Sequence, residues 1–257
     1  MDYFRLPNGL RVAHIHAGET GMLYRRIFVD RCYLRYGITL SPGNVIFDVG
    51  ANIGMASLFF SQYCSEITVY GFEPAEIPFS ALSENMSMHG IQGVCQQVAL
   101  SAAPGTRQFT YYPRATVMSG MYADDKEDSA LTRQFLRNSG FNEGQADRLL
   151  ASKYEPQTSF TNVTTLSQEI RSHGIGTIDL LKLDVEKSEF QVLLGLEDYD
   201  WPKVKQVVAE VHDIDGRLAE FVNLLRTHDF DTTAEQDKLL EDTEIYSVFA
   251  IRLEQGR

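Results

Sequence analysis

The sequence predicts an α/β domain in which helices cover both faces of a mostly parallel β-sheet. Strand and helix patterns alternate quickly between residues 45 and 101, and the alternation returns between residues 178 and 252. Parallel strands need a crossover connection, which a helix usually supplies. A glycine-containing turn, in VIFDVGANIG at 45–54, follows the first strand directly. Ligands bind at such strand ends in open α/β sheets, so the turn marks the expected site.

Two segments come before this alternation. LPNGLRV at 6–12 predicts a short strand pair, because Asn-Gly is a strong hairpin signal. Residues 20–36 carry apolar and basic side chains at helical spacing, and Gly37 is expected to end that helix. We expect residues 1–40 to form an N-terminal cap on a single domain that spans residues 1–257.

Apolar runs bounded by turn residues predict the strands. We expect strands at 45–49, 67–74, 93–101, 106–113, 178–185, 204–213 and 245–252. The run at 106–113 is expected to extend the sheet, and the run at 245–252 to close the chain. Apolar side chains at helical spacing predict the helices. We expect these within 50–64, 78–90, 186–198 and 216–230.

A polar stretch from Arg114 to Thr161 separates the two halves. Between residues 121 and 160 it holds seven acids and five bases, so it is not a tail of one charge sign. Two interpretations stay open. The segment is either a solvated helical decoration or a helical lid insertion at 114–161 that shapes the active site.

Composition excludes several classes of function. The 257 residues are 44% hydrophobic, which is enough for one sizeable core, and the net charge of −12 offers no basic face for nucleic acid. An acidic carrier protein would need a local basic patch. No run approaches the about 20 apolar residues that span a bilayer, and the start lacks a signal peptide. Three widely spaced cysteines predict reduced thiols in a cytoplasmic protein; they are Cys32, Cys64 and Cys95.

The sequence of the glycine turn narrows the choice of ligand. A P-loop needs Lys after its last glycine, and none follows Gly54. A dinucleotide site needs GxGxxG, whereas Gly50 and Gly54 are separated by three residues. S-adenosylmethionine remains. Asp48 can accept from its ammonium group, Gly50 opens room, and the turn amides bind its carboxylate. Glu73, at the end of the next strand, can take the ribose hydroxyls, with a solvated strand end as its alternative.

At this point the chain resembles a known family. FDVGANIG, YGFEP, VALS, IDLLKLDVEKSEF and VVAEVHD, in order from about residue 40 to 215, resemble the FkbM-type S-adenosylmethionine-dependent methyltransferases. Members mostly methylate hydroxyl oxygens on polyketide or peptide natural products and on sugars. The stretches YLRYGITLSPGNVIFDVGANIG, YYPRATVMSGMYADDKED and EVHDIDGRL look closer to the subset in polyketide and nonribosomal-peptide assembly lines, which act on carrier-bound or released intermediates.

The resemblance implies a Rossmann-like class I methyltransferase fold. Its seven-stranded sheet would be mostly parallel, with helices on both faces and an antiparallel last strand. Together with the turn, the resemblance assigns the methyl donor to Asp48, Gly50, Asn52, Gly54, Glu73, Ala99 and Asp184. One departure is visible. The family usually has Gly after the DVE acid, and here Lys187 stands there, so its turn is expected to differ and its cation to meet either a substrate or solvent.

Methyl transfer to an alcohol needs a base, because the hydroxyl pKa is far above neutral. His212, at the end of a strand, is the predicted general base, and Glu186 its partner or a second contact to the hydroxyl. Asp184 is expected near the methyl donor. Glu210 shares a strand side with His212. Lys182 is expected to form an internal ion pair with Asp184 or Glu210, since an unpaired buried charge is costly.

Alternatives stay open beside this hypothesis. Asp184, Glu186, Glu210 and Asp213 could hold a Mg²⁺ that lowers the hydroxyl pKa, although the nearby histidine argues against it. The acceptor could be a carboxylate or a sugar hydroxyl, and a non-catalytic S-adenosylmethionine-binding module is the rival from another class. Ser119 and Gly120 either line the pocket or form an ordinary turn, and Trp201 is expected to be a packing anchor. The other histidines are taken as structural; they are residues 14, 16, 89, 173 and 228.

Overall fold

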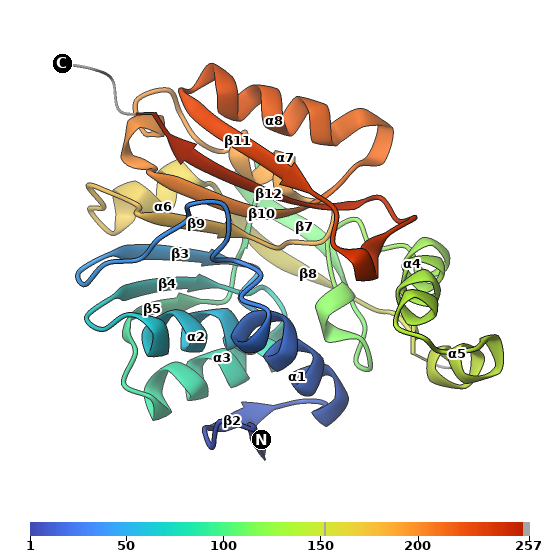
Figure 1. The fold of residues 1–257 in the computed structure, drawn as a ribbon. Helices are drawn as coiled ribbons and strands as arrows, with labels where there is room; N and C mark the ends of the chain where they lie inside the picture. The colour runs from blue at the N-terminus through green and yellow to red at the C-terminus, as the bar shows by residue number, and fades with distance from the viewer. Residues whose placement is uncertain (152, 254–257) are drawn as a thin grey trace.

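The computed structural model describes residues 1–151 and 153–253, and a seven-stranded sheet forms its centre (Figure 1). The sheet is mixed, since β12 runs antiparallel to both of its neighbours while the other neighbouring strands pair in parallel. The predicted α/β class is therefore confirmed. Across the sheet the strands are β11 (Phe230–Glu235), β12 (Ile245–Arg252), β10 (Gln206–His212), β9 (Leu180–Leu183), β3 (Val45–Val49), β4 (Thr68–Phe72) and β5 (Gln92–Gln96).

Helices cover both faces of the sheet (Figure 1). Neighbouring strand residues point to opposite faces, so Ile46 belongs to one buried apolar cluster and Phe47 to the other. The first cluster packs under α1 (Ala17–Tyr24), α2 (Met55–Tyr63) and α3 (Glu76–Met88). The second packs under α6 (Leu166–Ser172), α7 (Glu189–Leu193) and α8 (Arg217–Thr227).

A second, three-stranded sheet corrects two predicted strands. It consists of β6 (Ala99–Leu100), β8 (Gln157–Thr164) and β7 (Gly105–Tyr111). The strand predicted at 106–113 therefore does not extend the main sheet, and the one predicted at 93–101 is two strands in different sheets. The polar run in β7 fits a partly solvated antiparallel sheet better than a covered parallel one. The seventh main-sheet strand is β11, which had no apolar run to predict it.

The N-terminal segment forms the expected strand pair, β1 (Asp2–Arg5) with β2 (Arg11–His14), followed by α1. A π-helical turn, η1 (Arg25–Val29), continues α1, so the helix ends well before Gly37. The chain beyond it takes left-handed backbone angles at Arg31 and Tyr36, which no helix allows.

The polar insertion contains α4 (Asp125–Asn138) and α5 (Glu143–Leu150), which lie beyond one end of the main sheet (Figure 1). Asp124 begins α4 by accepting from two backbone amides of its first turn. The helical part is shorter than predicted, because β8 already starts at Gln157. Short 3₁₀ turns complete the described chain: η2 (Thr116–Met118), η3 (Trp201–Lys203), η4 (Ile214–Gly216) and η5 (Lys238–Leu240). Among the described residues, no helix has the length and apolar character needed to cross a bilayer.

Candidate active site

Two cavities meet at the carboxyl ends of β3 and β9. The glycine-turn cavity is lined by residues 50–52, Glu73 and Ala99. The insertion cavity, of about 560 Å³, lies between α1, α4 and α5. Tyr33, Asp184 and Glu186 line both cavities, so the two share a common wall of acidic side chains.

Gly50 is needed for a reason other than the predicted room for a ligand. Its φ is +73°, and a Cβ there would lie 1.8 Å from the carbonyl oxygen of Asp184. The segment after β9 thus crosses directly over the turn. Gly54 has φ +84°, and a Cβ added there would lie 2.8 Å from the Leu82 side chain. Gly54 does not line the cavity.

The amides of the turn are already used within the protein. The N–H groups of Gly50 and Ala51 both donate to the carbonyl oxygen of Phe72 at 3.0 Å. Asn52 N–H donates to Glu73 Oε2 at 2.9 Å, and Gly54 N–H to Ala51 O at 2.8 Å. The expectation that these amides are free to bind a carboxylate is therefore not met.

Glu73 is buried, with 6% of its surface exposed, so the solvated strand end is wrong. Its two oxygens accept from the backbone N–H groups of Asn52 and Ala75, both at 2.9 Å. Burial raises the pKa of Glu73 to about 7, against the opposing effect of these two bonds. A carboxyl oxygen keeps a second lone pair, so Glu73 can still accept from a ligand hydroxyl in the cavity.

Asp48 and Lys182 form an ion pair beneath the turn. Lys182 Nζ lies 3.0 Å from Asp48 Oδ1 and donates to Gly50 O at 2.7 Å. Asp48 is fully buried, also accepts from Ser57 Oγ at 2.6 Å, and lines neither cavity. Burial opposes the charge of Lys182, but the nearby carboxylates, Asp48 and Asp184 foremost, together outweigh it and raise the lysine pKa. Of the predicted partners of Lys182, Asp184 lies at 4.0 Å, the outer limit of an ion pair, whereas Glu210 pairs with Arg26 instead.

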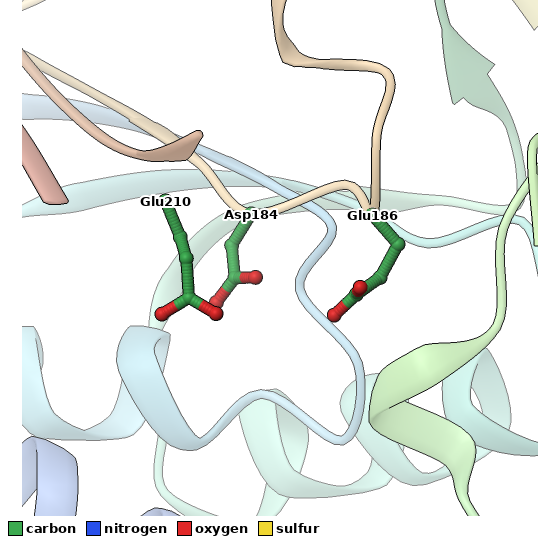
Figure 2. Close-up of side chains that lie close together, drawn as sticks. All are labelled: Asp184, Glu186 and Glu210. Atoms are coloured by element: carbon green, nitrogen blue, oxygen red, sulfur yellow. The ribbon is translucent and has the colours of Figure 1, made fainter. Parts of the chain in front are cut away.

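Three carboxylates point the same way at the common wall (Figure 2). Oxygens of Asp184, Glu186 and Glu210 lie within 4.8 Å of one another. Tyr33 Oη donates to Asp184 Oδ2 at 2.8 Å, and Arg26 pairs with Glu210 at 2.5 Å.

A divalent cation could be held by these three acids, since carboxylate oxygens are its usual ligands. The fourth predicted ligand, Asp213, does not join them. Its Oδ1 instead accepts from Leu218 N–H at 3.0 Å, at the start of α8.

His212 lies behind Glu186 and lines neither cavity. Its Nε2 is 3.3 Å from Glu186 Oε2, and its Nδ1 is 3.4 Å from Glu189 Oε1. Burial disfavours a charged imidazole, but the charges of Glu189 and Glu186 outweigh it and raise the pKa of His212 well above its ordinary value. Since His212 lines neither cavity, the geometry does not favour direct contact between its ring and an acceptor hydroxyl.

Glu186 is accessible from the cavities and has a pKa that suits a general base. It is 9% exposed, and burial raises its pKa to about 7 although the contact with His212 opposes the shift. A carboxyl that changes protonation near neutral pH suits general-base chemistry.

Three site residues were missed by sequence reasoning: Tyr33, Arg26 and Glu189. Tyr33 and Arg26 contact acids 151 and 184 positions further along the chain, so no local spacing reveals them. The basic side chains in YRRIFVDRCYLRYG were visible, but only the fold shows that this segment covers the strand ends.

Of the remaining predicted residues, some line a cavity and others have a structural role. Ser119 and Gly120 line the glycine-turn cavity. Trp201 is a packing residue, stacked on His228 with ring centroids 4.0 Å apart. His16 lines the insertion cavity, unlike the other histidines taken as structural. The three cysteines are free, and burial raises the pKa of Cys32 to about 12.

Comparison with known proteins gives the family. Residues 48–232 match the methyltransferase FkbM domain. The chain is 50% identical over 253 residues to the 31-O-demethyl-FK506 methyltransferase FkbM of Streptomyces tacrolimicus, which covers 98% of this chain and 97% of that one. It is 38% identical over 261 residues to the AMB antimetabolite synthetase AmbE of Pseudomonas aeruginosa, which covers 96% of this chain but 12% of that protein.

A solved structure supports the fold. The methyltransferase FkbM of Methylobacillus flagellatus superposes with a TM-score of 0.54 at 13% identity, over 84% of this chain and 46% of that one. This likeness concerns the fold alone, which is that of the class I methyltransferases. The full-length match to the Streptomyces enzyme and the domain match together show that this chain belongs to the FkbM methyltransferase family.

Proposed function

We propose that this chain transfers the methyl group of S-adenosylmethionine to a hydroxyl of a polyketide or peptide natural product, with Glu186 as the base. One observation carries the proposal: Glu186 stands where the glycine-turn cavity and the insertion cavity meet. A methyl donor in one cavity and an alcohol in the other would face each other at this carboxylate.

The glycine-turn cavity is the donor site in this proposal. Glu73 would bind the ribose hydroxyls, and Ala99 would line the adenosine portion. Asp184 is the acid within reach of the donor's ammonium group, because Asp48 lies beneath the turn and holds it through Lys182. The family and its fold imply S-adenosylmethionine as the methyl donor.

The insertion cavity is the acceptor site. Its walls are largely apolar, while its floor carries the acidic cluster. Such a site fits a bulky apolar molecule that brings one hydroxyl to the floor, and it fits a sugar less well. The name of the Streptomyces relative supports the choice, since it describes an FK506 derivative that lacks a methyl on an oxygen. The apolar wall includes Met22, Leu131, Phe135, Leu136, Phe141 and Leu149.

In the proposed reaction Glu186 takes the hydroxyl proton while the oxygen bonds to the methyl carbon. The sulfur–carbon bond breaks in the same step, leaving neutral S-adenosylhomocysteine. His212, which lies between Glu186 and Glu189, would fix the carboxylate of Glu186 from behind. His212 thus supports the base, whereas the sequence analysis expected it to be the base.

Glu186→Gln tests the role of the base. We expect the methylation rate to fall about 10²- to 10⁴-fold, the usual contribution of a general base. Donor affinity by calorimetry should stay near the wild-type value. His212→Asn should reduce the rate less, because Glu186 keeps its place at the wall.

Other outcomes would separate the rivals. If His212→Asn removes activity while Glu186→Gln retains it, His212 is the base. If neither variant loses activity toward a carboxylic acid acceptor, ester formation is favoured, since a carboxylate needs no proton removal. Each hydroxylated acceptor should be offered both free and as a carrier-protein thioester, because the cavity alone favours neither presentation.

A further inference from the structure

Lys187 holds an unusual backbone position beside Glu186. Both residues lie in the left-handed region, with φ +50° at Glu186 and +71° at Lys187. A glycine would take the second angle without strain, whereas a residue with a Cβ does so only where its surroundings hold it. The side chain of Lys187 therefore needs a structural reason to be there.

That reason is a buried ion pair with the insertion. Lys187 is 5% exposed, and its Nζ lies 2.9 Å from Asp128 Oδ1 and 3.0 Å from Glu127 Oε2. Both acids stand in the first turn of α4. The expected contact with solvent is therefore corrected, and Lys187 lines neither cavity.

Asp128 is itself held in place by further hydrogen bonds. It is 1% exposed, and its Oδ2 accepts from Tyr112 Oη at 3.2 Å and from Asp124 N–H at 2.9 Å. The backbone of Lys187 is held from the other side. Its N–H donates to Glu189 Oε1 at 2.9 Å, and its carbonyl accepts from Arg217 at 3.0 Å. The turn that carries Glu186 is thus clamped between α4, α7 and α8.

The same helix α4 forms a wall of the acceptor site. Leu131 and Phe135 follow Asp128 along α4 and line the insertion cavity. An acceptor that fills this cavity therefore rests on the helix that holds Lys187. The ion pair is the direct connection between that wall and the turn.

We infer that Lys187 is a positioning residue that joins α4, which forms a wall of the acceptor site, to the turn of Glu186. It thereby places the Glu186 carboxylate beside the acceptor hydroxyl. The inference rests on the proposed role of Glu186 as the base. It assigns α4 a part in catalysis through contact with the turn, beyond covering the cavity.

The test is the double variant Lys187→Met/Asp128→Asn, which removes both charges and leaves no buried charge without a partner. We expect kcat to fall about ten- to a hundredfold, as for a misplaced catalytic group. The donor Kd should stay near the wild-type value, since Lys187 lines neither cavity. Lys187→Gly/Asp128→Asn serves as a second variant, because it keeps the backbone angle free of strain while cutting the link and leaving no unpaired buried charge.

Arg133→Met is the matched control. Arg133 pairs with Glu143 and Asp147 on the exposed side of the same insertion and does not touch the turn, so its loss should leave kcat unchanged. Thermal melting of every variant separates a lower kcat from a lower folded fraction.

These experiments separate failure of the inference about Lys187 from failure of the proposed function. If Glu186→Gln stays active, the base assignment fails and this inference fails with it. If Glu186→Gln is inactive but the folded double variant keeps the wild-type kcat, or only its acceptor KM rises, Lys187 does not position the base. A matching loss of donor affinity would also overturn the inference, since it would show that the whole turn has been disturbed.

Discussion

At the scale of single residues, Glu186 is buried and acidic and yet is accessible from the cavities. It is buried enough for its pKa to rise to about 7, yet it still lines both cavities. His212 behind it contacts two carboxylates, which raise its pKa well above the ordinary value, and it reaches neither cavity. The division of roles follows from which side chain reaches the cavities.

The pH dependence of methylation tests this division. The ionised form of Glu186 is the active base, so activity should be low when the carboxyl is protonated. We expect kcat/KM to rise about tenfold per pH unit below pH 7 and to level off above it. The donor must be saturating at each pH, because Glu73 titrates near the same value. A flat profile from acid to neutral pH would argue against Glu186 as the base.

The sequence predicted the chemistry of the site residues better than their contacts. Asp184, Glu186 and Glu210 were predicted together, and the strand ends bring them together. The shorter ion pair of Lys182 was missed, because the register of β3 against β9 sets Asp48 directly beside it. Local spacing cannot give such a pairing, since it depends on which strands become neighbours.

At the scale of elements, the segment after β9 crosses over the glycine turn and lines the glycine-turn cavity with it. Gly50→Ala places a methyl group against the carbonyl oxygen of Asp184, which is backbone and cannot turn away. Gly43→Ala is the control, because Gly43 has φ +86° but open space around it. We expect Gly43→Ala to lower the free energy of unfolding by about 1–2 kcal/mol.

Gly50→Ala should cost about 1–3 kcal/mol more than this control, from the added clash. Urea denaturation measures both values. Equal losses in the two variants would mean that the turn and the β9 segment separate easily, and that Gly50 is needed for its backbone angle alone.

Strands with continuous apolar runs were predicted, and strands with polar runs were misplaced or missed. Val45–Val49 and Leu180–Leu183 are covered by helices on both faces, so their sequences are apolar except for Asp48 and Lys182, which pair with each other. FDTTAE in β11 lies at the edge of the sheet and keeps polar side chains in water. Edge position depends on the whole topology, so the local sequence does not reveal it.

At the scale of the whole molecule, the N-terminal segment and the insertion both line the insertion cavity. Arg26 reaches Glu210 from η1, while Lys187 reaches Asp128 in α4. These links join parts of the chain that are far apart in sequence. Within the acidic cluster, the charge of Glu210 is therefore neutralised by a side chain of the protein itself.

This neutralisation predicts metal-independent catalysis. Arg26 offsets the charge of Glu210, and Tyr33 donates to Asp184, so two of the three acids already have partners. Treatment with EDTA should leave the methylation rate unchanged, and added Mg²⁺ should not raise it. Loss of activity that Mg²⁺ restores would instead assign the cluster to a metal.

The central claim is that Glu186 faces both the donor and the acceptor. A crystal structure of the chain with S-adenosylhomocysteine and a hydroxylated acceptor tests it most directly. We expect a carboxylate oxygen of Glu186 within about 2.6–3.2 Å of the acceptor oxygen, the usual reach of a general base. An acceptor oxygen bound to His212, or one that approaches the sulfur without touching Glu186, would contradict the claim.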